Sequence, residues 1–82
     1  MNTFELKLRE ILKGYLYFTA PIEEIDPEAN LENYGLDSFM YIKLVVTLEN
    51  EFQIEFDDEA LDFRNFSTIK SITGYIAAKS DS

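Results

Sequence analysis

The chain contains no cysteine and no histidine among its 82 residues. Without cysteine it can form no disulfide and has no thiol nucleophile, and without histidine it has no imidazole that titrates near neutral pH. A serine nucleophile usually needs a histidine base, and a zinc site needs histidine or cysteine ligands. We therefore predict that the chain is not an enzyme and has neither catalytic nor metal-binding residues.

Basic residues are scarce too, with seven against sixteen acidic ones and a net charge of −9. Such a surface repels nucleic acid and anionic lipid. The acidic stretch DDEALDFRNF lacks the glycine and the alternating oxygen ligands of an EF-hand, so no calcium site is predicted. Residues 20–38 hold six carboxylates and no base. This charge can speed encounter with basic protein partners, or it can simply keep a small domain in solution.

Long apolar runs are also missing. None approaches the roughly 20 residues that a membrane span needs. The first ten residues, MNTFELKLRE, contain no uninterrupted apolar segment of the kind that marks secretion. We expect a cytoplasmic protein without a membrane span. The length suits one domain over residues 1–82, with a core from about 4 to 78 and a frayed tail over 79–82.

What the chain does have is helical periodicity along its length. It predicts a first helix with Asn2 as N-cap, a second over Ser38–Phe52, a short one around Asp58–Phe63, and a last one capped by Ser67 or Thr68. Prolines and a glycine predict a long ordered loop ahead of the second helix. The apolar residues expected to fasten this loop to the core are Ile22, Ile25 and Leu31. The predicted fold class is all-α, a four-helix bundle with three longer helices and one short third helix.

The predicted second helix has two apolar stripes rather than one. At about 100° per residue, one stripe faces the core; its members are Tyr41, Leu44, Val45, Leu48 and Phe52. A second stripe lies nearly opposite, and a surface helix needs only one apolar face. Either the long loop covers this second stripe or a partner protein binds it. The predicted partner-binding residues are Phe39, Met40, Ile42, Lys43 and Val46.

Ser38 lies where this helix begins, behind a Gly-x-Asp sequence. As structure alone, Asp37 or Ser38 is an ordinary N-cap and Gly35 an ordinary turn residue. A helix N-terminus also favours phosphate, because free backbone N–H groups and the helix dipole point towards it. A phosphodiester on the Ser38 hydroxyl would therefore be electrostatically favourable.

The stretch GLDSFMYIKLVVTLENEF, followed by FSTIKSITGYI, resembles the acyl and peptidyl carrier protein family over nearly the whole chain. The hallmark of that family is Gly-x-Asp-Ser at the start of the second helix of a four-helix bundle. The resemblance implies that Ser38 receives a covalent phosphopantetheine arm from coenzyme A, with Asp37 as its adjacent acid. A phosphopantetheinyl transferase and magnesium attach the arm, whose terminal thiol carries cargo as a thioester. The chain can lack cysteine because the cofactor brings the thiol.

Departures from the family pattern narrow the expected role. Fatty-acid carriers resemble one another in an acidic second helix, whereas this helix has Met40 and Lys43 among its early positions. We therefore favour a discrete, monomeric carrier in a polyketide or nonribosomal peptide pathway, served by adenylation, acyltransferase, ketosynthase or condensation enzymes. A housekeeping carrier of fatty acid synthesis is the alternative within the family. A non-covalent helical docking module, in which the Asp–Ser pair is only a cap, is the alternative outside it.

Overall fold

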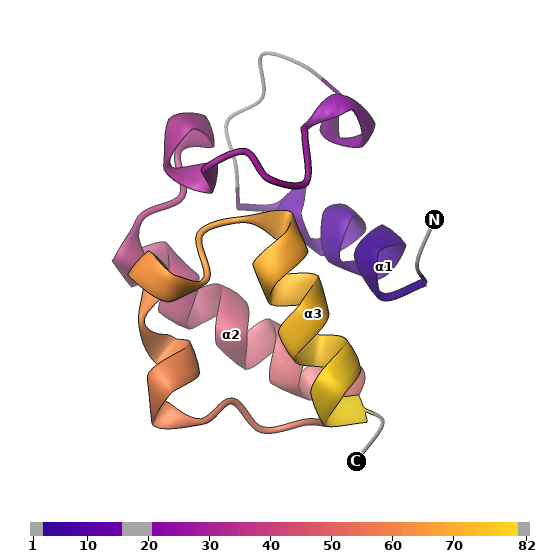
Figure 1. Ribbon diagram of the computed structural model, residues 1–82, viewed down its shortest axis with the longest axis vertical. Coiled ribbons are helices and arrows are strands. Elements are labelled where there is room, and N and C mark those ends of the chain that lie inside the picture. The colour runs from indigo at the N-terminus through magenta and orange to yellow at the C-terminus, as the bar shows by residue number, and fades with distance from the viewer. Residues whose placement is uncertain (1–2, 16–20, 81–82) are drawn as a thin grey trace.

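The computed structural model describes residues 3–15 and 21–80, which contain three α-helices and four short 3-10 turns (Figure 1). In chain order the elements are α1 (Thr3–Leu12), η1 (Ile22–Glu24), η2 (Leu31–Tyr34), α2 (Ser38–Phe52), η3 (Asp58–Leu61), η4 (Phe63–Asn65) and α3 (Ile69–Ser80). These described ranges contain no strand. The all-α prediction is confirmed, and the structure has the predicted bounds of α2.

The predicted short third helix does not form as an α-helix. Residues 58–65 instead make the two 3-10 turns η3 and η4, which meet at Asp62. Asp62 has an extended backbone, and its carboxylate accepts a hydrogen bond from the Arg64 backbone N–H at 3.0 Å. Such a local side-chain bond competes with continued helix formation. The four-helix count is thus replaced by three α-helices and a double turn.

Of the helix ends, the end of α3 differs from its prediction. Helix α1 ends at Leu12, and the following turn closes with a Tyr15 N–H to Leu12 carbonyl bond of 2.9 Å. Helix α3 continues through Lys79 and Ser80, two residues into the expected tail. The predicted cap Asn2 and residues 81–82 lie outside the described residues. Thr68 caps α3, since its hydroxyl accepts a bond from the Ser71 N–H at 3.1 Å.

The core lies where the three helices meet. Helix α1 packs against α3, and α2 passes behind α3 in the view of Figure 1. Four of the five residues predicted for the core stripe of α2 are buried: Tyr41, Leu44 and Leu48 fully and Val45 nearly so. The fifth, Phe52, is half-buried and packs against the core. From α3, Ile69, Ile72 and Ile76 are fully buried. No helix in the described part of the chain is long and apolar enough to cross a membrane.

Residues 21–37, which precede α2, run across one end of the molecule, by the start of α3 (Figure 1). The predicted anchors of this segment, Ile22, Ile25 and Leu31, are all buried. Backbone bonds join it to the start of α3, from the Leu31 N–H to the Ser67 carbonyl at 2.8 Å and from the Lys70 N–H to the Pro27 carbonyl at 2.9 Å. This segment therefore closes the end of the bundle near the start of α2.

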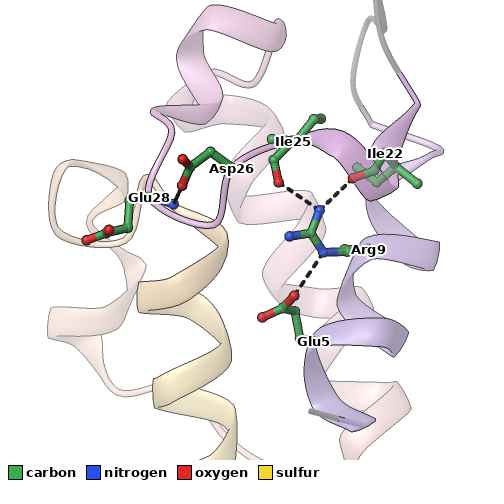
Figure 2. Close-up of polar contacts among 6 residues, drawn as sticks. All are labelled: Glu5, Arg9, Ile22, Ile25, Asp26 and Glu28. Carbon is green, nitrogen blue, oxygen red and sulfur yellow. Dashed lines mark hydrogen bonds and ion pairs between the residues drawn. The ribbon is translucent and has the colours of Figure 1, made fainter. Parts of the chain in front are cut away.

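A buried arginine on α1, Arg9, also binds the segment that precedes α2 (Figure 2). The Arg9 Nη1 donates to the carbonyls of Ile22 and Ile25 at 2.5 and 2.9 Å, and its Nε donates to Glu5 at 3.1 Å. Arg9 is only 4% exposed. A buried guanidinium is tolerated when it has hydrogen-bond acceptors and a paired charge, and here Nη1 and Nε have acceptors and Glu5 pairs the charge. Next to this contact, Asp26 accepts a bond from the Glu28 N–H, which fixes the following turn.

We expect Arg9→Met to lower the free energy of unfolding by about 1–3 kcal/mol, because it leaves the Ile22 and Ile25 carbonyls without their buried donor. Lys13→Met is the matched control. It removes the same charge from an exposed side chain that pairs with Glu10 at 3.2 Å, and such pairs contribute about 0–1 kcal/mol. Urea denaturation measures both variants. Equal losses would show that the buried contacts of Arg9 do not stabilise the fold.

Candidate functional site

Ser38 is placed by the turn that precedes α2. Gly35 ends η2 in the left-handed region, at φ 98°, where glycine is favoured. Leu36, which follows, is buried and ties the turn to the core. The Asp37 carboxylate then accepts a bond from the Met40 N–H at 2.7 Å. Of the two possible caps, the structure has Asp37, and Ser38 is the first residue of the helix.

Because Asp37 caps the helix, the Ser38 side chain does not serve as the N-cap. It is exposed, and the hydrogen bonds among the described residues do not involve its hydroxyl. The first N–H groups of an α-helix have no acceptor within the helix, and they favour an anion. A phosphate on this hydroxyl would lie beside the N-terminus of a fifteen-residue helix. The residues present therefore fit a phosphodiester-linked group.

A hollow of about 420 Å³ opens beside Ser38. Its lining residues come from three separate segments and are Glu32, Asp37, Ser38, Asp62, Phe63 and Arg64. Four of these six were not predicted from the sequence, because only the tertiary fold brings them to Ser38. One signal was available for Arg64, since it is the only basic residue between Lys43 and Lys70. A second hollow, of about 430 Å³, lies at the far end of α2 and contains no predicted site residue.

One ion pair lies on the wall of the hollow beside Ser38. The Arg64 Nη2 and Nε donate to the two carboxylate oxygens of Asp62 at 2.8 and 3.1 Å. The Arg64 guanidinium lowers the pKa of the Asp62 carboxyl, and Asp62 raises the pKa of Arg64 in turn. Both groups therefore remain charged near neutral pH. Among the described residues, no group of histidine, cysteine, aspartate or glutamate could hold a metal ion.

The second stripe of α2 is exposed. Phe39 is 71% exposed, Val46 53% and Ile42 44%, so the described part of the loop does not cover them. Lys43 is exposed beside them, with its Nζ 4.8 Å from the centre of the Phe39 ring. Met40, the fifth predicted partner residue, differs because it is half-buried and packs against the core. The structure thus brings four of the five predicted residues to one open face of α2, next to Ser38.

A buried aromatic pair, Tyr41 of α2 and Phe63 of η4, joins the first turns of α2 to the 3-10 turns. The Tyr41 ring lies 5.2 Å from the Phe63 ring, and its hydroxyl donates to the Ala60 carbonyl at 2.6 Å. Burial, with smaller contributions from Tyr75 and Asp62, raises the pKa of Tyr41 well above its ordinary value. Tyr41 therefore stays protonated and keeps donating to Ala60. Through this contact α2 is joined to η3 and to the wall of the hollow.

The sequence is similar to one family of known proteins, as its match to a family model and its relatives both indicate. The family model for a phosphopantetheine attachment site matches residues 6–76. An aminoacyl carrier protein of Agrobacterium fabrum is 38% identical over 65 residues, which cover 79% of this chain and 78% of that protein. An acyl carrier protein of Nitratidesulfovibrio vulgaris is 33% identical over 76 residues, or 92% and 95% of the two chains.

A solved structure agrees with these relatives. It is described as an engineered Bradyrhizobium japonicum glycine:[carrier protein] ligase complexed with a carrier protein from Agrobacterium tumefaciens and ATP. The matching chain superposes with a TM-score of 0.77 at 33% identity, over 92% of this chain and 97% of that one.

These findings decide between the broad alternatives. A match over 6–76 and relatives of nearly the same length favour a carrier over a non-covalent docking module. They also imply a covalently attached phosphopantetheine and a non-catalytic role, as predicted. The chain belongs to the acyl and peptidyl carrier protein family, whose members have a phosphopantetheine attachment site.

Proposed function

We propose that Ser38 carries the phosphopantetheine arm and that the chain carries amino acids in a specialised biosynthetic pathway. The observation that carries the first part is the exposed Ser38 hydroxyl at the first position of α2, left free because Asp37 caps the helix. The bound arm supplies a terminal thiol that holds the cargo as a thioester. We expect a monomer that works in the cytoplasm and meets its enzymes in turn.

Asp37 has a structural part in this proposal. Its carboxylate fixes the first turn of α2 through the Met40 N–H, and so it sets the direction in which Ser38 points. A phosphopantetheinyl transferase must bring the pyrophosphate of coenzyme A to this hydroxyl. An exposed serine at a capped helix start is accessible to such an enzyme without unfolding. Asp37 is accordingly a positioning residue for the attachment reaction.

The open face of α2 supports an amino acid cargo over a fatty acyl cargo. Phe39, Ile42 and Val46 form an apolar surface with Lys43 at its edge, whereas fatty-acid carriers resemble one another in an acidic helix at this place. We propose that the cargo-loading enzyme binds this face, with Phe39 as its anchor and Met40 at its inner edge. The aminoacyl carrier relative and the ligase complex support a loading enzyme of the adenylating type. Other expected partners are acyltransferase, ketosynthase or condensation enzymes.

The cargo class can be tested by competition. Protein carrying the arm is offered to a set of amino acid:carrier protein ligases with ATP, magnesium and small amino acids, and in parallel to an acyltransferase of fatty acid synthesis with its acyl donor. We expect the mass of one aminoacyl group to be added and then removed by hydroxylamine, which cleaves thioesters. Protein without the arm is the control and should gain nothing. Loading by the acyltransferase alone would instead indicate the housekeeping carrier of fatty acid synthesis.

A further inference from the structure

The hollow beside Ser38 has an unequal charge distribution. Among the described residues, its lining contains the carboxylates of Glu32, Asp37 and Asp62, and a single cation, Arg64. A phosphodiester on Ser38 adds a further negative charge at the edge of this group. Like charges close together are unfavourable unless a cation lies between them or water screens them. Arg64 is therefore the one side chain in the described lining that can offset the new charge.

The position of Arg64 allows its guanidinium to exchange Asp62 for a phosphate. Its backbone is held, because its N–H donates to Asp62 at 3.0 Å within η4. Its side chain is 88% exposed, and among the described residues its guanidinium contacts Asp62 alone. Exposed ion pairs of this kind contribute little to stability, so the side chain can leave Asp62 at small cost. A guanidinium also binds phosphate through two parallel N–H bonds, which suits a phosphodiester as well as a carboxylate.

We propose that Arg64 is a positioning residue for the arm, which binds the phosphodiester on Ser38 in competition with Asp62. This inference rests on the proposed attachment at Ser38. In the unmodified protein the Asp62 carboxylate holds the guanidinium at the wall of the hollow. In the modified protein the guanidinium turns towards Ser38 and holds the base of the arm over the hollow. The base of the arm then stays beside η4 and next to the hollow. Without this contact it would rotate freely about the Ser38 side chain.

The test uses phosphorus-31 NMR of the protein with its arm, since the arm contributes a single phosphorus atom. The resonance of the folded protein is compared with that of the same protein unfolded in urea, where the phosphodiester has no fixed contact. We expect Arg64→Gln to move the folded resonance towards the unfolded position. Lys70→Gln removes the same charge from a side chain that is 71% exposed and pairs with Glu28, and it should leave the resonance unchanged.

Two further measurements sharpen the result. Asp62→Asn removes the competing carboxylate, so it should move the resonance away from the unfolded position. Sodium chloride at about 1 M, where the Debye length is about 3 Å, should move the wild-type resonance towards that of Arg64→Gln. In nitrogen-15 spectra, the Arg64 Nε–H signal should shift when the arm is attached. Arg64→Lys keeps the charge without the planar fork and should restore the wild-type resonance only in part.

The outcomes separate the two proposals. An arm that is absent from Ser38 overturns both the attachment site and the role of Arg64. An arm present on Ser38, with one phosphorus resonance shared by wild type, Arg64→Gln and Lys70→Gln, overturns the role of Arg64 alone. If the arm is on Ser38 and its attachment does not shift the Arg64 Nε–H signal, the role of Arg64 is also contradicted.

Discussion

Replacing Ser38 with alanine is expected to abolish attachment of the phosphopantetheine arm while leaving the domain folded. Wild-type protein incubated with coenzyme A, magnesium and a broad-specificity phosphopantetheinyl transferase should gain one arm, detected by intact-mass spectrometry. The Ser38→Ala variant should gain none, because no other serine of the described chain stands at the start of a helix behind Gly-x-Asp. Loss of the arm also means loss of all cargo loading.

The capping geometry explains why the fold survives this change. The Met40 N–H bonds to Asp37 and not to Ser38, so Ser38→Ala removes no capping bond. Asp37→Ala should lower the free energy of unfolding by about 1 kcal/mol, the usual cost of losing an N-cap, and Ser38→Ala by less. Thermal melts followed by circular dichroism compare the two.

The control for the mass measurement is Ser80→Ala, since Ser80 is exposed at the end of α3 and should not affect attachment. An arm found on Ser38→Ala protein would leave the family assignment intact but place the arm on another residue. An arm absent from wild-type protein, under conditions that modify a known carrier, would contradict the attachment proposal itself.

Helix α2 could be predicted from sequence because its determinants are local. A Gly-x-Asp turn marks its start, and the spacing of its apolar residues fixes which side faces the core. Both exposed and buried stripes followed from the same angle of about 100° per residue. The exposure of Phe39 and the burial of Leu48 agree with that analysis. Local patterns of this kind suffice wherever the nearest neighbours in space are also neighbours in sequence.

The missed features depend on contacts between distant segments. Arg9 looks like a surface residue of α1, but it is buried, and its guanidinium donates to the carbonyls of Ile22 and Ile25, thirteen and sixteen residues further along the chain. The third helix was predicted from its apolar spacing, which does not reveal that the Asp62 carboxylate bonds to the backbone and divides the segment into two turns. The hollow beside Ser38 was missed for the same reason as Arg9, because its walls come from residues on both sides of α2.

The two faces of α2 should respond oppositely to truncation, and Leu48→Ala should have the largest effect on stability. Leu48 is fully buried, so alanine there leaves a cavity and lowers the free energy of unfolding by about 2–5 kcal/mol. At about 0.05–0.15 kcal/mol per residue, a domain of this length has a total stability of about 4–12 kcal/mol. Leu48→Ala can therefore unfold a large fraction of the protein. Urea denaturation followed by circular dichroism measures the loss.

Phe39→Ala and Val46→Ala should leave the urea midpoint nearly unchanged, because both side chains are more than half exposed and alanine is the better helix former. Their effect should fall on the loading enzyme. Truncating an interface anchor commonly costs about 1–2 kcal/mol, which corresponds to a loss of roughly five- to thirty-fold in kcat/KM for cargo loading. Glu55→Ala, on an exposed residue beyond the end of α2, is the matched control and should change neither quantity. If Phe39→Ala unfolds the domain while Leu48→Ala only slows loading, the core face and the partner face of α2 are interchanged. If neither Phe39→Ala nor Val46→Ala slows loading, the enzyme binds the carrier elsewhere.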